Sequence, residues 1–511
     1  MTRVEENFLN FFGDTNFISE VSKSKFGIER ECLRVYNKAI SKKSHPAIFG
    51  SSLFNRYITT DFSESLLEFI TPPISSKDET IKFLDTIQHF VSHNINNEIL
   101  WPFSMPPYIH SDDDIRIAHY GSSNEALFKM LYRRGLSYRY GRKMQTIAGV
   151  HFNYSFSENL WHLDLLNDTT STINEVKEVF YFRALRNINR TNWLIIYLFG
   201  ASPIINDLFI SFSQEKFKKI KNSYYLPHAT SLRMSDIGYQ NTSQSNIRIS
   251  LNSLDDYAHD IKKYTRTESN LFSEMNINNN QHQINTNILQ TEDEYYSSSR
   301  PKNSSPSKQR MSSRLLDSGI EYIEFRSLDI NPFHKTGIDY KTLVFLEMYI
   351  NYCTFKESPF LSEIEIKDNQ LNNINVARNG RKPDHILLRD GEKISLKSWG
   401  REVLEEMHAV ICQSEYEESI ITEQIEKIDD PDKTLSALFF DKFCSSNLSF
   451  DEFGQSIGES NKIDYLNKSH LSNRNWDVLS QEAKKAKQDQ INAESKDDIS
   501  FSKYLDEYFS Q

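Results

Sequence analysis

The sequence has little cysteine, and its thiols are not paired as they are in disulfide frameworks or zinc cages. Its 511 residues contain four cysteines, Cys32, Cys353, Cys412 and Cys444, which lie far apart and form no CxxC pair. Isolated thiols of this kind are typical of reduced cysteines in the cytosol. The pattern favours a cytoplasmic protein over one held together by disulfides or structural zinc.

Long apolar runs and an excess of basic residues are also missing. The most apolar stretch, WLIIYLFGASPII at 193–205, is shorter than a membrane span and contains Gly200 and Pro203. The N-terminus, MTRVEENFLNFFGDTNF, has acidic residues where a signal peptide would carry its apolar core. The formal charge of −11 lacks the basic field of a nucleic-acid binder. We therefore expect no membrane or nucleic-acid partner, although local Arg, Lys or metal could still bind an anionic substrate.

Glycine-rich phosphate loops are absent as well, and two metal-like patterns have simpler explanations. The chain contains neither GxxxxGK[ST] nor GxGxxG, so any bound ATP is held without a P-loop. His89 and His93 have the spacing of HExxH, but Phe90 stands where that motif has Glu, which favours a helix surface. The acids of HSDDD at 110–114 are adjacent and unconstrained, which favours a loop.

The residues that are present predict a mixed fold with a substantial core, because 38% are hydrophobic and 13% aromatic. Apolar alternation predicts strands within 26–35, 58–73, 148–157 and 321–329. Helical spacing predicts a helix over 75–95 with Ser at its cap, a helix over 178–200 that Gly200 stops, and a helix over 398–411. It also predicts a charged helical end over 480–510. The polar, Pro/Ser-rich segment 297–313 is predicted to be a mobile surface loop.

Each predicted strand carries an acid or an imidazole in an otherwise apolar run. In EYIEFRSLD at 321–329, Glu324 and Arg326 share one face because strand side chains alternate. Carboxylates with one imidazole suit Mg²⁺ or Mn²⁺, which prefer oxygen and keep positions open for phosphate. A solvated strand face explains any single residue, so the residues alone leave both interpretations open. The candidates are Glu29, Glu31, Asp61, Glu68, His151 and Glu324.

Asp61 and Glu68 pose a geometric problem. They are seven positions apart, so an uninterrupted strand would place them on opposite faces. If both bind metal, residues 63–65 must form a turn or a bulge between two strand pieces.

Eight segments, in this order along residues 26–335, resemble the proteobacterial type of the glutamate–cysteine ligase family. Beyond residue 335 only fragments such as GRKPD at 380–384 match. The matching segments are GIERECLRV, ITTDFSESLLEFITPP, WPFSMPPYI, YGSSNEALFKMLYRRGLSYRYGRKMQTIAGVHFNYSF, YLFGASPII, YYLPHATSLRMSDIGY, NILQTEDEYY and GIEYIEFRSLDINPF.

The resemblance implies an α+β, glutamine-synthetase-like fold, in which a curved antiparallel sheet forms the active-site floor and helices surround it. It implies ATP-dependent joining of the glutamate γ-carboxyl to the cysteine amine, the first step of glutathione synthesis. We expect a single unit over 1–511, with a catalytic core over about 1–380 and a mostly helical packing region over about 381–511. The expected partners are glutamate, cysteine and ATP, and the expected state is a monomer.

The resemblance also implies roles for individual residues. Glu29, Asp61, Glu68, His151 and Glu324, with Glu31 nearby, match the family's Mg²⁺ ligands, and Mn²⁺ is a possible substitute. Glu324 and Arg326 are the expected catalytic residues, with Arg326 reaching the transferring phosphoryl group. The substrate-binding positions that carry over are Arg233, as a clamp for a substrate carboxylate, and Tyr132, Arg133, Tyr239 and Tyr296, on the cysteine side.

Three other functions fit parts of the pattern. A carboxylate–amine ligase with a different acceptor would be favoured if Tyr239 and Tyr296 did not line one pocket. A metal-dependent phosphohydrolase would turn over ATP without amino acids. A non-catalytic binding protein is disfavoured because clustered carboxylates that serve no purpose cost stability by repulsion.

Overall fold

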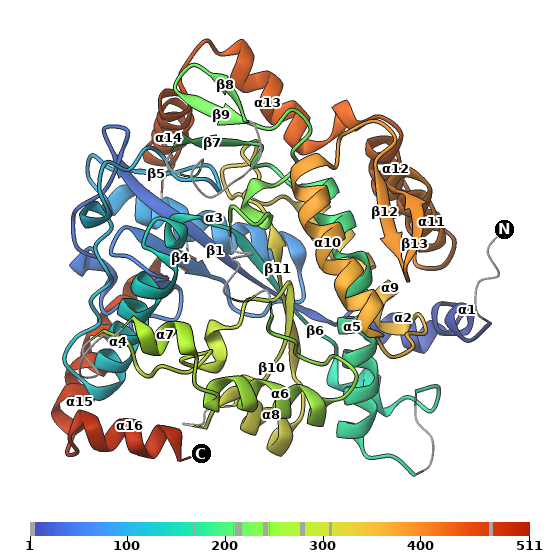
Figure 1. Ribbon diagram of the computed structural model, residues 1–511, viewed down its shortest axis with the longest axis horizontal. Coiled ribbons are helices and arrows are strands. Elements are labelled where there is room, and N and C mark those ends of the chain that lie inside the picture. The colour runs from blue at the N-terminus through green and yellow to red at the C-terminus, as the bar shows by residue number, and fades with distance from the viewer. Residues whose placement is uncertain are drawn as a thin grey trace.

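Strands that lie far apart in the sequence pair into one antiparallel sheet at the centre of the computed structural model (Figure 1). The structure describes residues 6–166, 170–207, 209, 217–238, 244, 246–275, 282–305, 309–469 and 474–510. Within these ranges the main strand order is β10-β11-β6-β1-β4-β3, and β2 and β5 pair with the far end of β1. The strands are β1 (Lys25–Tyr36), β2 (Ala39–Ile40), β3 (Ile58–Thr60), β4 (Leu66–Ile70), β5 (Ile99–Leu100), β6 (Val150–Ser155), β10 (Ser299–Lys302) and β11 (Tyr322–Leu328).

The register of this sheet brings the charged residues together. Glu31 of β1 lies opposite Glu68 of β4, and Glu29 lies opposite His151 of β6. Directly opposed residues of an antiparallel pair project to the same face. A register shift between Phe325 and Leu328 interrupts the pairing of β11 with β6, next to Arg326. The mixed helix and antiparallel-sheet class predicted from the sequence is confirmed.

The β3–β4 hairpin resolves the spacing of Asp61 and Glu68. Asp61 follows β3 directly, and its backbone N–H donates to the carbonyl of Leu66 at 3.0 Å. The hydroxyls of Ser63 and Ser65 are 3.0 Å apart within the turn. The predicted interruption at residues 63–65 is therefore present, and Asp61 and Glu68 both border the same cavity.

The loop predicted over 297–313 is wrong in part. Residues Ser299–Lys302 form β10, which pairs with β11 and places Arg300 opposite Glu324. Pro301 had argued against a strand, but β10 is at the edge of the sheet, where a missing backbone N–H leaves no neighbouring strand unpaired. Residues 306–308 lie outside the described part of the chain.

Helices pack against the face of the sheet that lies opposite the acids. Arg30, which points away from Glu29, donates to Gln88 of α3, and Phe325 contacts Tyr349 of α9 with ring centroids 6.3 Å apart. Ser76 caps α3, and the predicted stop at Gly200 ends α5. The helices are α1 (Glu6–Gly13), α2 (Thr15–Val21), α3 (Lys77–Asn94), α4 (Asn124–Tyr140), α5 (Ile173–Phe199), α6 (Leu254–Arg266), α7 (Asn270–Glu274), α8 (Met311–Ser318), α9 (Tyr340–Phe355), α10 (Glu363–Asn379), α11 (Leu396–Val410), α12 (Glu415–Asp429), α13 (Leu435–Ser445), α14 (Phe450–Leu466), α15 (Arg474–Lys496) and α16 (Phe501–Phe509).

The last third of the described chain is mostly helical, and its end returns to α4. In Figure 1 the red helices α15 and α16 lie at lower left, beneath α4. Two short sheets complete the fold: β7 (Ile204–Asn206) pairs with β9 (Ser223–Tyr225), which pairs with β8 (Lys218–Ile220), and β12 (Ile386–Arg389) pairs with β13 (Glu392–Ser395). None of the described helices combines the length and the apolar character that a membrane span requires.

Candidate active site

One face of the central sheet gathers three carboxylates around a single imidazole. His151 Nδ1 lies 3.2 Å from a carboxylate oxygen of Glu29 and 3.5 Å from one of Glu324. Its Nε2 lies 3.6 Å from a carboxylate oxygen of Glu31. The Asn153 amide donates to the other oxygen of Glu29 at 2.8 Å, and the Gly149 N–H donates to Glu31 at 2.6 Å. We call this acid-bearing face the active-site floor.

Basic side chains stand beside the floor at the β11 edge. Arg326 Nη1 donates to Glu324 at 2.6 Å, and Lys302 Nζ lies 3.2 Å from the other oxygen of Glu324. Although burial opposes ionisation, the charges of Arg326 and Lys302 lower the pKa of Glu324 well below its ordinary value. Glu324 is therefore held as a carboxylate. Arg326 and Lys302 also supply positive charge at this edge of the floor, where an anionic reactant could bind.

The pKa values of Glu68 and Glu31, in the middle of the floor, are shifted upward, whereas that of Glu324 is shifted downward. Burial, together with the charges of Glu29 and Asp61, raises the pKa of Glu68 well above its ordinary value. Burial is also the main cause of the raised pKa of Glu31. Carboxylates packed this closely repel one another, and a cation between them would relieve that repulsion.

The donor set on the floor fits a hard divalent cation. Single ligand atoms of Glu29, Glu68 and His151 all lie within 4.8 Å of one another. Oxygen donors with one imidazole match the preferences of Mg²⁺ and Mn²⁺. The raised pKa of Glu68 supports the fit, since this half-buried side chain lacks a cationic partner among the ion pairs of the described residues.

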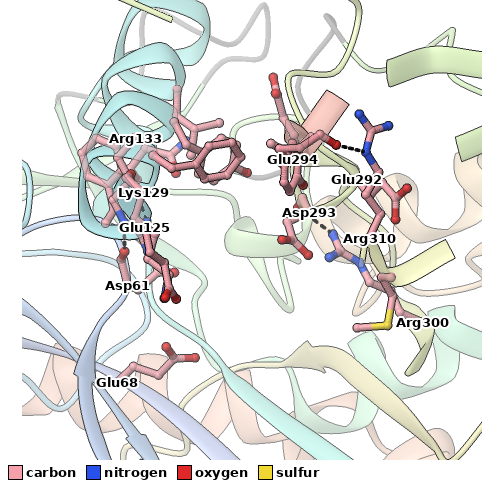
Figure 2. A pocket seen from close by; sticks show the side chains of 18 of the residues that line it. Asp61, Glu68, Glu125, Lys129, Arg133, Glu292, Asp293, Glu294, Arg300 and Arg310 are labelled. Carbon is pink, nitrogen blue, oxygen red and sulfur yellow. Dashed lines mark hydrogen bonds between the residues drawn. The ribbon is translucent and has the colours of Figure 1, made fainter. Parts of the chain in front are cut away.

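A cavity of about 940 Å³ opens above the floor (Figure 2). In Figure 2, Asp61 and Glu68 lie at its base. Glu125, Lys129 and Arg133 of α4 form one wall, and the segment of Glu292, Asp293 and Glu294 with Arg300 and Arg310 forms the opposite wall. Acidic and basic groups of both walls thus line one space that is large enough for a nucleotide and small substrates.

The structure brings several of the predicted substrate residues to this cavity. Tyr132, Arg133 and Tyr296 line it, and the Arg326 guanidinium lies 5.9 Å from the centroid of the Tyr296 ring. The Arg133 guanidinium stacks on Tyr120 at 4.7 Å, and its Nε donates to the carbonyl of Asp61. Arg133 therefore links α4 to the β3–β4 hairpin. Tyr239 lies outside the described residues.

Arg233 lies deeper than its predicted role suggests. Only 1% of its surface is exposed, and it is not among the residues that line the cavity. Its Nη2 donates to the Arg326 carbonyl at 3.0 Å, and its Nη1 lies 3.8 Å from Asp329. A Cβ at Gly149 would overlap the guanidinium, so this glycine makes room for it. In this conformation Arg233 supports the backbone beneath Arg326.

Several cavity residues escaped prediction from the sequence. Arg300 and Lys302 sit in the segment interpreted as a loop, although their alternation about Pro301 was a usable strand signal. Lys129 lies one turn before Arg133 on α4, so helical periodicity could have found it. Tyr504 and Tyr508 of α16 carried no local signal, because only the tertiary fold brings them to the cavity.

Comparisons with known proteins agree with this geometry. The family model described as glutamate–cysteine ligase matches residues 9–376. The chain is 38% identical to glutamate–cysteine ligase of Alcanivorax borkumensis over 94% of its own length and 95% of that relative's. It is 37% identical to the enzyme of the same name from Pseudoalteromonas translucida, over 98% of both chains.

Solved structures give the same result. The crystal structure of glutamate–cysteine ligase from Francisella tularensis in complex with AMP superimposes with a TM-score of 0.89 at 32% identity, covering 96% of this chain and 98% of that one. A bifunctional glutathione synthetase from Pasteurella multocida, at 24% identity, shares the fold with a TM-score of 0.72 over 91% of this chain and 54% of its own. The chain belongs to the glutamate–cysteine ligase family, and it catalyses the ATP-dependent formation of γ-glutamylcysteine, the first step of glutathione biosynthesis.

Proposed function

We propose that the floor binds Mg²⁺, or Mn²⁺ in its place, and that the ions sit against the ATP phosphates. The observation that carries this proposal is the convergence of Glu29, Glu68 and His151 within 4.8 Å. Glu31, Asp61 and Glu324 would complete the donor set, since Glu31 and Glu324 approach His151 and Asp61 borders the cavity next to Glu68. Bound there, divalent cations would neutralise charge that develops on the transferring phosphoryl group.

The side chains around the floor would serve the first half-reaction. An oxygen of the glutamate γ-carboxylate attacks the γ-phosphorus of ATP, the bond to the β-phosphate oxygen breaks, and ADP leaves. Both reactants are anions, so cations must face the equatorial oxygens of the phosphoryl group. Arg326 is proposed for this role, because its guanidinium lies at the cavity and Glu324 fixes it at 2.6 Å. Lys302, at 3.2 Å from Glu324, is placed to assist.

The cavity walls would serve the second half-reaction. The cysteine amine attacks the acyl carbon of γ-glutamyl phosphate, the carbon–oxygen bond to phosphate breaks, and the amine loses a proton to solvent or to phosphate. Water must be kept from the acyl phosphate, because hydrolysis would consume ATP without forming a peptide bond. Tyr132 and Tyr296, with Arg133 and Tyr239, are proposed for the cysteine side. Arg233 is proposed to clamp a substrate carboxylate after rearrangement, or to act by holding Arg326 in place.

We also propose the fold type, the cellular location, the oligomeric state and the division of the chain into two regions. A sheet with one carboxylate-rich face beneath a nucleotide-sized cavity supports a glutamine-synthetase-like description. AMP in the Francisella relative supports a nucleotide in the corresponding cavity here. We propose a cytoplasmic monomer organised as a core over about 1–380 and a mostly helical region over about 381–511.

The test is phosphate release from Mg-ATP, with glutamate present and with cysteine or 2-aminobutyrate added in turn. We expect release to require glutamate and an amine acceptor and to yield one dipeptide per phosphate. Release without either amino acid would instead support a metal-dependent phosphohydrolase. Dipeptide formation with 2-aminobutyrate but not cysteine would point to a ligase with a different acceptor.

A further inference from the structure

The C-terminal segment packs against α4 at the edge of the cavity, which Tyr504 and Tyr508 of α16 also line. Leu505 of α16 is buried with Leu131 of α4 and with Ile284. Phe128, on the same helix, contacts Tyr504 and Tyr508 with ring centroids 6.2 and 4.6 Å apart. Phe128 itself lines the cavity, and Phe128 and Leu131 are the sequence neighbours of the lining residues Lys129 and Tyr132. The position of that wall therefore depends on α16.

The chain just before α16 is bonded to the N-terminal end of α4. The Ser122 N–H donates to the Glu494 carboxylate at 2.9 Å, and the Asn124 side-chain amide donates to the Ile499 carbonyl at 3.0 Å. The Asn124 N–H also donates to the Asp497 carboxylate. Anionic acceptors at a helix N-terminus are favourable because the first N–H groups of a helix have no partner within it.

The same segment also contacts the opposite wall. Arg310 precedes α8, and its guanidinium stacks on Tyr508 at 5.2 Å and on Phe509 at 5.1 Å. Its Nε donates to the Tyr508 carbonyl at 3.3 Å. Arg310 lines the cavity beside Glu292, which accepts from the Ser312 N–H at 2.8 Å. Figure 1 shows α16 lying below α4 and extending toward α8.

We propose that residues 494–509, here called the C-terminal strap, are a positioning element that sets the spacing between the two walls of the active site. The strap holds α4 on one side and Arg310 on the other, so it fixes where Tyr132 and Arg133 stand relative to the floor. The proposal rests on the proposed function, because it assigns these α4 residues to the cysteine side. Small displacements of positioning groups are costly, since attack on an acyl carbon needs near-contact geometry.

Leu505 provides the cleanest test, because it is buried in the strap and does not line the cavity. We expect Leu505→Ala to raise the KM for cysteine by about tenfold through displacement of α4. We also expect more phosphate than dipeptide, because a loosened wall admits water to the acyl phosphate. Leu505→Met, which refills the site, should restore both values to near wild type.

Leu404→Ala is the control, because Leu404 is also buried (0% exposed, against 8% for Leu505) but lies on α11, on the other side of the molecule from α4 (Figure 1). Assays are run below the melting temperature of each variant, so that loss of folded enzyme does not mimic a kinetic effect. If Leu505→Ala and Leu404→Ala lower stability alike and both keep the wild-type KM and stoichiometry, the strap is only a stabilising element and the proposal is overturned.

Hydrogen exchange of the α4 amides separates this proposal from the proposed function. We expect the amides of residues 124–140 to exchange faster in Leu505→Ala than in Leu404→Ala. This measurement needs no substrate, so it does not depend on which amine is the acceptor. Unchanged exchange there would refute the strap. Phosphate release by the wild-type protein without amino acids would refute the roles proposed for the floor and the cavity walls. The exchange result would still decide whether the strap holds α4.

Discussion

Glu324 is the residue on which the charges of the site converge. It is 2% exposed and has Arg326, Lys302 and His151 within 2.6, 3.2 and 3.5 Å of its carboxylate oxygens. A buried anion beside Arg326 and Lys302 serves two purposes: it offers an oxygen to a metal, and it orients the guanidinium that faces the cavity. This explains why an acid and a base occupy one face of an otherwise apolar strand.

Replacing Glu324 with Gln should abolish ligation while leaving the fold intact. The amide keeps the shape but removes the charge that orients Arg326 and contributes to the proposed metal site, so we expect kcat/KM to fall by at least about 10²-fold. Steady-state kinetics and circular dichroism measure the two effects.

Glu321→Gln makes the same chemical change immediately before β11, where the side chain accepts from Ser304 away from the floor. It should retain near-normal turnover. Wild-type turnover in Glu324→Gln would remove this residue from the mechanism.

At the scale of elements, close packing fixes the helices that surround the sheet. Gly454 of α14 faces Trp101, which follows β5 and is fully buried. A Cβ at Gly454 would overlap the six-membered ring of that indole. Alanine normally favours a helix over glycine by about 1 kcal/mol, so steric overlap and helix propensity act in opposite directions here.

We expect the steric overlap to outweigh the gain in helix propensity, because a buried indole cannot move without displacing its own neighbours. Gly454→Ala should lower the free energy of unfolding by about 1–3 kcal/mol, as measured by urea denaturation. Gly13→Ala is the matched control, since no atom lies within 4 Å of a Cβ built there. It should be neutral or slightly stabilising. Equal stability of the two variants would show that α14 can shift away from Trp101.

At the scale of the whole molecule, the floor links stability to pH and metal. The raised pKa values of Glu68 and Glu31 mean that the folded, metal-free site retains protons above the ordinary carboxyl value of 4.5. Such groups favour the folded state most below that value, and their contribution is lost as the pH rises toward the raised pKa. Mg²⁺ would replace these protons, so its binding should strengthen over the same range.

Mg²⁺ should therefore raise the melting temperature more at pH 8 than at pH 5, just above the ordinary carboxyl value of 4.5. Binding at a concentration about 100 times the Kd adds about 2.7 kcal/mol to the free energy of unfolding. Thermal unfolding with and without Mg²⁺ at both pH values measures the effect, and Glu68→Gln should reduce it. A Mg²⁺-dependent shift that is equal at both pH values would contradict the protonation argument.

Local rules predicted much of the fold and part of the site. Alternation located β1, β6 and β11, and the Ser76 cap and Gly200 stop marked helix ends that the structure confirms. β10 was missed because Pro301 is unfavourable in a strand unless the strand lies at an edge, and edge position is a property of the sheet. The burial of Arg233 was missed because its partners, Asp329 and the Arg326 carbonyl, are about a hundred positions away.

The sequence by itself determined which chemistry is available: oxygen donors, one imidazole and basic side chains. It also placed them in segments that alternate like strands, because backbone geometry sets the period with which side chains change faces. Only the tertiary structure decided that they meet. The register of β1 with β4 and β6 aligned Glu31 with Glu68 and Glu29 with His151, and the β3–β4 turn brought Asp61 to the same side. The strap reached the cavity through contacts between residues more than 300 positions apart. Such contacts depend on the packing of complete elements, which no local pattern encodes.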